Sequence, residues 1–226
     1  SSPSNPTGGV YTKDELEAIA KVVVKHPKIM IISDEIYEYI NFDGKHESIA
    51  QFDFIKEQVV TVNGFAKGFA MTGWRVGYIG APEWLAKACD KMQGQFTSGT
   101  NSIAQRACID ALNGTMEPTY EMTRAYKRRR DLVLDKLNAM EGVKTYLPKG
   151  AFYIFPDVSY YFGKSFGSQK INNADELSMY LLNEAHVSLV TGNAFGAPNC
   201  IRISFAASDE SLIEAMNRIS NALKIL

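Results

Sequence analysis

The first 116 residues alternate between helical and strand-like hydrophobic patterns. Residues 12–15 (Thr-Lys-Asp-Glu) have the form of a capping box, and the apolar residues after them recur at helical spacing. This pattern predicts a helix that runs to about Lys25. Residues 29–32 (Ile-Met-Ile-Ile) are a short continuous apolar run, which is typical of a strand covered on both faces.

Residues 58–62 predict a second buried strand, and residues 76–79 predict a third. The segment between the first two strands is long enough for a crossover connection, so we expect them to pair in parallel. A helix beginning at Pro82 and a second with a capping box at residues 102–105, ending at Gly114, continue the alternation. The pattern indicates an α/β layer architecture.

The pattern changes after about residue 116. Residues 117–140 predict one long charged helix. Beyond it, short strand-like pieces alternate with helices, and Ser208 is the N-cap expected for the last helix. These elements are 151–155, 175–184, 187–190, 200–205 and 209–223.

Three parts of the chain follow from this change in pattern. We expect residues 1–116 to belong to a large α/β domain, residues 117–142 to form an inter-domain helix, and residues 143–226 to form a small α+β domain.

Composition and charge exclude several classes of partner. The chain is 46% hydrophobic and 22% charged, which is ordinary for a globular protein, and its formal net charge is −1. Neither a nucleic acid nor an anionic membrane is therefore expected as a partner. The basic residues 127–130 lie in a predicted helix with acidic neighbours, so we interpret them as a solvated helix face.

Targeting and metal patterns are missing as well. No apolar run approaches the length of a transmembrane helix, and no signal peptide is present. The three cysteines and three histidines are scattered and match no zinc pattern, so no metal site is expected. Free thiols in a reducing cytoplasm fit this cysteine usage best.

Lys67 is the most informative residue of the chain. It lies between Ala66 and Gly68 and is flanked by Phe65 and Phe69, which is an unusual setting for a lysine. A lysine removed from water becomes an amine nucleophile that can form a Schiff base. Taken alone, the residue is better explained as an exposed lysine on a loop of small residues.

Three further charged residues can be related to Lys67. Asp34 follows the first buried strand, so it should emerge at the same sheet edge as Lys67, unless it only caps the next turn. Arg75 is a cation suited to a phosphate. Arg202 lies inside the strand-like residues 200–205, where it either faces solvent or meets an anion in a cleft.

Five segments together resemble one enzyme family. They occur in the order and spacing of the class I pyridoxal-phosphate aminotransferases of fold type I, and the chain looks most like bacterial aspartate aminotransferases. These segments are residues 4–9, 33–37, 64–77, 150–153 and 201–205. The resemblance implies an α/β fold: the second half of the family's large domain, with a mainly parallel sheet, followed by its small C-terminal α+β domain.

The resemblance also assigns roles around a pyridoxal 5′-phosphate cofactor. Lys67 is implied as the catalytic residue, which forms the Schiff base and then moves a proton between the substrate and the cofactor. Asp34 is implied to pair with the pyridinium nitrogen. Tyr37 and Asn5 are implied to bond the 3′ oxygen, and Arg75 to bind the phosphate.

On the substrate side, the resemblance implies that Arg202 grips the α-carboxylate, with Asn5 also among the substrate-binding residues. Residues 93–101 resemble a loop that crosses to the partner subunit's site in family dimers. A homodimer is therefore expected of the full-length protein, with an amino acid and a 2-oxo acid as its small-molecule partners.

The chain departs from the family pattern in two places. Gly64 stands where many relatives have a phosphate-binding serine, so one hydroxyl contact is missing. The family's phosphate loop and the aromatic residue that stacks on the cofactor lie in a segment with no counterpart in these 226 residues. We therefore expect the chain by itself to be weakly active or inactive.

The expected reaction is transfer of an amino group between aspartate and 2-oxoglutarate. An aromatic or alanine substrate stays open, as does a lyase or racemase on the same scaffold, because the same electron sink serves those reactions. A ligand-sensing module of a larger regulator and an inactive structural fragment are the remaining alternatives.

Overall fold

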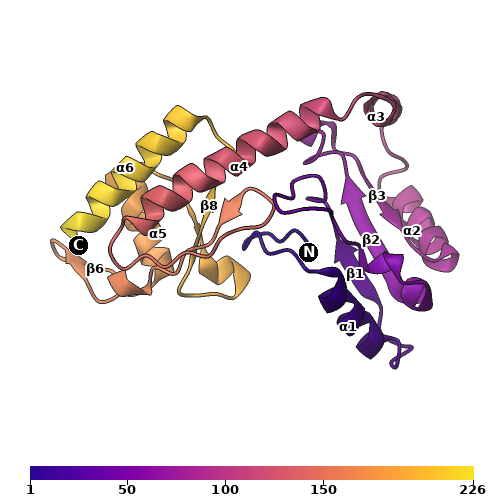
Figure 1. Cartoon of the computed structure of the whole chain (residues 1–226), viewed down its shortest axis with the longest axis horizontal. Coiled ribbons are helices and arrows are strands. Elements are labelled where there is room, and N and C mark those ends of the chain that lie inside the picture. The colour runs from indigo at the N-terminus through magenta and orange to yellow at the C-terminus, as the bar shows by residue number, and fades with distance from the viewer. The chain divides into compact units, whose positions relative to one another are not determined.

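The computed structural model describes residues 1–226, and their contacts divide the chain into two compact units. The first unit comprises Ser1–Ser4 and Gly9–Thr123, and the second comprises Asn5–Gly8 and Arg124–Leu226. The division falls inside the long helix α4 (Glu117–Asn138), which Figure 1 shows as one continuous helix. The three-part domain assignment made from the sequence stays a prediction.

The first unit contains the alternating helices and strands that the sequence predicts. Its elements before α4 are α1 (Lys13–Val23), β1 (Ile31–Asp34), η1 (Ile49–Gln51), η2 (Asp53–Gln58), β2 (Val59–Gly64), η3 (Thr72–Trp74), β3 (Gly77–Gly80), α2 (Glu83–Phe96) and α3 (Ser102–Asn113), where η marks a 3-10 helix.

The three strands of this unit form one sheet in the order β1-β2-β3 (Figure 1). β1 and β2 are parallel, with Ile31 opposite Val59 and Asp34 opposite Val62, which confirms the expected pairing. β3 runs antiparallel to β2. The sheet is therefore mixed within this chain.

Only one face of β1 is covered by the first unit. The core on that face contains Leu16 and Ala20 of α1 and Val59 of β2, with Ile31 packed against it. Ile32 points the other way, as alternate residues of a strand do, and its side chain is 73% exposed. The prediction of a strand buried on both faces is wrong for this chain, since no element of the unit covers the second face.

Helix starts in the first unit follow local hydrogen bonds. Thr12 and Glu15 form the expected capping box at α1, with Thr12 accepting from the Glu15 amide and Glu15 accepting from the Thr12 amide. At α3 the N-cap is Asn101 rather than Ser102, because the Asn101 side chain accepts from the Ala104 amide at 3.0 Å. The capping box predicted from Ser102 is thus wrong by one position, although the helix itself is confirmed.

The second unit packs two helices with a small antiparallel sheet. Its elements after α4 are β4 (Tyr153–Ile154), η4 (Ser159–Tyr161), β5 (Ser165–Phe166), β6 (Gln169–Lys170), α5 (Ala174–Ala185), β7 (Val190–Thr191), η5 (Gly192–Phe195), β8 (Ile201–Ser204) and α6 (Asp209–Ile225). The sheet order is β4-β8-β7, and β5 and β6 form a separate hairpin that the sequence did not predict.

The core of the second unit lies between α5 and α6. Leu177 and Leu181 of α5 and Met216 and Ile219 of α6 are buried, and the hydroxyl of Tyr180 donates to the carbonyl of Ala222 at 2.9 Å. Ser208 caps α6 as predicted. No helix of the chain has both the length and the apolar content needed to cross a membrane.

Arg130 corrects the expectation that residues 127–130 form a solvated face. Its side chain is buried, pairs with Asp131 and donates to the carbonyl oxygen of Pro148 at 2.9 Å. Arg128 and Arg129 instead pair with Asp209 at the start of α6. The charged run therefore contributes contacts within the second unit, because an arginine can bury its stem while its guanidinium finds acceptors.

Candidate functional site

Two predicted site residues lie at one edge of the mixed sheet. Asp34 is the last residue of β1 and pairs with Val62 of β2. β2 ends at Gly64, and the chain then reaches Lys67. Because β1 and β2 are parallel, their carboxyl ends lie side by side, and functional groups gather at this edge in open α/β sheets.

Asp34 combines the two interpretations that the sequence left open. Its Oδ1 accepts a hydrogen bond from the Ile36 amide at 3.2 Å, so it does cap the turn after β1. Its backbone carbonyl accepts from the Ser2 amide at 3.1 Å. The side chain is only half-buried, so a carboxylate remains at the sheet edge while the backbone is held on both sides.

Lys67 lies on a loop that aromatic rings pack tightly. Its Nζ is 6.0 Å from the ring centre of Tyr37, which is itself only 4% exposed. Phe65 and Phe69 pack with their ring centres 5.3 Å apart. Lys67 is half-buried as a result, which fits the unusual setting predicted for it.

The residue after the lysine must be a glycine because it packs closely against Tyr39. A Cβ atom on Gly68 would lie 2.4 Å from Cδ2 of Tyr39, so this close approach requires glycine. Burial, and then the neighbouring Glu38 carboxylate, raise the pKa of Tyr39 to about 12. The Tyr39 ring therefore stays uncharged at neutral pH and acts as a packing surface for the lysine loop.

Arg75 presents an exposed cation from a constrained backbone. It follows η3 in the left-handed region, with φ 56° and ψ 48°, and its Nη1 donates to the Thr72 carbonyl at 2.9 Å. A non-glycine residue in this region costs about 1 kcal/mol or more, and such strain is concentrated at functional sites. The position is compatible with the predicted phosphate contact.

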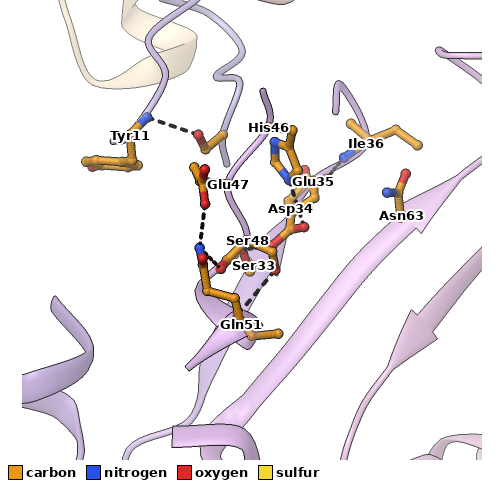
Figure 2. A network of polar contacts seen from close by, with 12 residues as sticks. Tyr11, Ser33, Asp34, Glu35, Ile36, His46, Glu47, Ser48, Gln51 and Asn63 are labelled. Carbon is orange, nitrogen blue, oxygen red and sulfur yellow. Dashed lines mark hydrogen bonds and ion pairs between the residues drawn. The ribbon is translucent and has the colours of Figure 1, made fainter. Parts of the chain in front are cut away.

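The structure adds a buried carboxylate that sequence reasoning missed. Glu35 is 3% exposed, and its Oε1 accepts from Ser33 Oγ at 2.8 Å and from Ser48 Oγ at 2.7 Å. His46 Nε2 lies 2.9 Å from Oε2 of the same carboxylate (Figure 2). Because an ionised carboxylate only accepts hydrogen bonds, Nε2 carries the proton in this pair.

These donors keep Glu35 ionised. Burial by itself raises the pKa of the Glu35 carboxyl, but hydrogen bonds from His46, Ser48 and Ser33 outweigh it and hold the pKa below its ordinary value. Sequence patterns assign no role to His46, because it lies 11 residues from Glu35 along the chain. The only sequence signal for a role of Glu35 is its position as a second acidic residue directly after Asp34.

In the second unit, Arg202 is held in β8 by aromatic and polar neighbours. Its guanidinium carbon lies 4.6 Å from the ring centre of Tyr153 and 5.1 Å from that of Phe195. Nη1 donates to Oδ1 of Asn5 at 2.8 Å. Arg202 Nε is buried and has no hydrogen-bond partner, which is an unsatisfied donor that an anion could use.

Asn5 reaches Arg202 because a glycine anchors its segment within this unit. The Gly8 carbonyl accepts from the amides of Lys149 at 2.8 Å and Gly150 at 3.0 Å. Gly8 has φ 68°, and a Cβ there would lie 2.4 Å from Cβ of Pro148, so only glycine fits. Asn5 and Arg202 thus form one polar pair.

Comparison with known proteins connects both groups of residues to one family. The sequence profile of the family described as aminotransferase class I and II matches residues 1–219. The chain belongs to this family.

Individual aminotransferases resemble it over nearly its whole length. The chain is 49% identical to the aspartate aminotransferase of Pinus pinaster, with 100% of this chain and 47% of the relative covered. The crystal structure of the aspartate aminotransferase from Rhizobium meliloti matches with a TM-score of 0.94 and 41% identity, covering 99% of this chain and 56% of that one. An aromatic aminotransferase from Pyrococcus horikoshii matches with a TM-score of 0.91 and 42% identity, covering 99% and 58%.

The comparisons confirm the predicted family and fold. The chain has the fold type I aminotransferase architecture and spans about half the length of the curated relatives it matches. No group of three or more histidine, cysteine or acidic side chains is arranged to hold a metal ion.

The residues present fit the family's pyridoxal-phosphate cofactor. The first unit supplies an amine at Lys67, a carboxylate at Asp34, a phenol at Tyr37 and an exposed guanidinium at Arg75. These are the groups needed to bind an aldehyde, a ring nitrogen, a ring oxygen and a phosphate.

Close packing explains why glycine occupies position 64 in this chain. A Cβ atom at this position would lie 2.9 Å from the Val76 carbonyl oxygen and 3.0 Å from the Gly77 Cα. The side chain of Asn63 also folds back to accept from the Gly64 amide at 2.7 Å. A serine here would need the backbone around β3 to shift.

Proposed function

We propose that this chain carries the catalytic lysine of a pyridoxal-phosphate-dependent aminotransferase that moves an amino group between aspartate and 2-oxoglutarate. The observation that supports it most is the placement of Asp34 and Lys67 at adjacent carboxyl ends of parallel strands, with buried Tyr37 beside the lysine. Family membership supports the same reaction class.

In this proposal, four residues of the first unit each bind a different part of the cofactor. Bound pyridoxal phosphate supplies an electron sink that stabilises negative charge at the substrate's α-carbon. Lys67 Nζ would hold the cofactor at its aldehyde group and would take and return the substrate's α-proton. Asp34 holds a proton on the ring nitrogen, Tyr37 donates to the ring oxygen, and Arg75 binds the phosphate.

Arg202 and Asn5 orient the substrate in the same proposal. The guanidinium lies close to the rings of Tyr153 and Phe195, which limits its motion, and its buried Nε has no hydrogen-bond partner within the chain. A planar guanidinium suits a carboxylate because it donates two parallel hydrogen bonds. Asn5 orients the guanidinium by accepting a hydrogen bond from its Nη1.

The choice of aspartate rests on the names of relatives, so it needs its own test. A relative named aspartate aminotransferase supports aspartate, whereas the aromatic aminotransferase of Pyrococcus horikoshii supports an aromatic amino acid as a second candidate. Single-turnover assays with aspartate, phenylalanine and alanine discriminate between these candidates. Release of ammonia without conversion of the cofactor to its amine form would indicate a lyase instead.

Covalent capture of the cofactor tests the core of the proposal. The chain is mixed with pyridoxal phosphate, reduced with borohydride and digested, and the modified peptide is identified by mass spectrometry. We expect the modification at Lys67 and a loss of the visible absorbance change in Lys67→Ala. Modification spread over surface lysines such as Lys87, with no preference for Lys67, would contradict the proposal.

The proposal has three further parts. The chain by itself has low activity, the longer protein forms a homodimer, and its location is cytoplasmic. The chain matches only about half of each relative's length, and the family resemblance implies a shared dimeric site. A steady-state rate equal to that of a full-length relative would contradict the low activity. An active full-length form that sediments as a monomer would contradict the dimer.

A further inference from the structure

Glu35 lies between two proposed cofactor contacts but faces the opposite side of the chain. Side chains of an extended segment alternate between faces, so Ser33 and Glu35 share one face and Asp34 has the other. The Ser33 hydroxyl donates to Glu35 Oε1, which ties the two together on their common face. That bond holds the Ser33 and Glu35 side chains on the face opposite Asp34.

Glu35 is also the junction between β1 and the turn that carries Tyr37. Its amide donates to the Val62 carbonyl at 2.8 Å, which continues the β1–β2 pairing beyond Asp34. Its own carbonyl accepts from the Glu38 amide at 2.9 Å, which closes the turn around Tyr37. A shift of Glu35 therefore displaces both neighbours.

The two other donors to the carboxylate belong to a well-anchored segment. Ser48 is the N-cap of η1, where its Oγ accepts from the Ala50 amide at 3.2 Å, and the next residue, Ile49, is buried in the core. His46 reaches the same carboxylate and is nearly buried, with its Nδ1 left without a partner. Figure 2 shows Ser33, His46 and Ser48 gathered around Glu35 beside Asp34.

We propose that Glu35 is a positioning residue: its three-donor carboxylate fixes the strand end and turn that place Asp34 and Tyr37 for the cofactor. A buried ionised carboxylate with three donors is rigid, because losing any donor leaves a charge unsatisfied. Hydrogen-bond partners that orient metal ligands from behind change metal affinity by about tenfold or more when altered, and we expect an effect of the same order here. This inference rests on the proposed function and adds a residue to it.

The variant Glu35→Gln tests the inference, because it keeps the shape while replacing one acceptor oxygen with a donor amide. Glu47→Gln is the matched control: it removes a carboxylate from the same segment, where Glu47 bonds only the exposed side chain of Gln51. Both are compared with the unchanged chain by titration with pyridoxal phosphate and by amide hydrogen exchange of the cofactor-free chain.

We expect Glu35→Gln to weaken cofactor binding about tenfold and to speed amide exchange at Ile36 and Tyr37, with no change in Glu47→Gln. Unchanged exchange at these amides would overturn the inference, whether or not the chain binds cofactor. A lowered melting temperature with unchanged cofactor affinity would also overturn it, since that is the result of a purely structural role.

The proposed function and this inference can be refuted independently of each other. If the unchanged chain shows no capture of pyridoxal phosphate at Lys67, the proposed function is wrong. Faster exchange at Ile36 and Tyr37 in Glu35→Gln would still establish the carboxylate as the group that holds this turn, while equal exchange would remove that role as well.

Discussion

The buried hydroxyl of Thr119 donates a 2.9 Å hydrogen bond to the carbonyl oxygen of Gly68, the residue that follows Lys67. Thr119 lies in the first turn of α4, so this helix fastens the lysine loop within the first unit. One turn further along, Thr123 Oγ1 donates to the Tyr39 carbonyl at 2.9 Å. Thr119 thus bonds Gly68 and Thr123 bonds Tyr39, and these two residues pack against each other beside the lysine.

Thr119→Val is expected to destabilise the first unit and loosen the lysine loop. The change keeps the shape but leaves a buried carbonyl unsatisfied, which costs about 1–3 kcal/mol. Chemical denaturation measures this loss, and borohydride capture measures the smaller fraction of Lys67 that reacts with pyridoxal phosphate. Thr119→Ser keeps the hydroxyl and should restore most of the captured fraction. Equal capture in Thr119→Val and the unchanged chain would show that the bond does not position Lys67.

Arg202→Lys is expected to weaken the binding of a non-reacting dicarboxylate to the cofactor-loaded chain. Lysine keeps the charge but cannot donate two parallel bonds, and a lost hydrogen bond to a charged group costs about 2 kcal/mol, or roughly thirtyfold in affinity. Isothermal calorimetry gives the dissociation constants. Arg218→Lys is the control, because Arg218 is exposed and pairs only with Glu214. Equal effects of the two variants would contradict the role given to Arg202.

Gly64→Ser is expected to destabilise the chain without improving cofactor binding, even though it restores the serine of many relatives. The new Cβ would meet the Val76 carbonyl oxygen at 2.9 Å, and overpacking of this kind costs about 1–3 kcal/mol. Gly73→Ala is the matched control, since a Cβ there meets nothing within 4 Å. Urea denaturation and cofactor titration compare the two. Tighter binding at unchanged stability would mean that the backbone around β3 adapts readily.

Acid is expected to destabilise the first unit in part through Glu35. The pKa of this carboxyl is lower in the folded chain than in the unfolded one, so its contribution to stability is complete above the unfolded pKa of about 4.3. That contribution is lost as pH falls through the lowered folded pKa. Denaturation midpoints measured from neutral pH downward should therefore decline less steeply for Glu35→Gln than for the unchanged chain. Parallel curves would contradict the lowered pKa.

Local signals in the sequence predicted local structure well. The capping box at Thr12 and the N-cap at Ser208 are recognisable because the donors and acceptors lie within a few residues of each other. The parallel pairing of β1 and β2, which brings Asp34 and Lys67 to one edge, followed from a rule of chain connection rather than from any contact.

Features that depend on distant residues were not predictable in the same way. The hydrogen bonds of Glu35 with His46 and Ser48 join positions that no periodicity relates. The sequence pattern predicts that Arg130 is one of several solvated basic residues. Its side chain is instead buried and donates to the Pro148 carbonyl oxygen. The apolar character of Ile32 favours burial, but burial also needs a covering element, which this unit does not supply, and the side chain is exposed.

The anchoring of Gly8 onto Lys149 and Gly150 makes the second unit discontinuous along the chain. A single cut before Arg124 would release a piece that has lost Asn5, the acceptor for Arg202, together with the Gly8 carbonyl that satisfies two backbone amides. The second unit cannot be excised as one segment, and its assembly must wait until α6 has been made. A circularly permuted chain that joins residues 5–8 to the second unit through a short linker is the form in which that unit becomes separable.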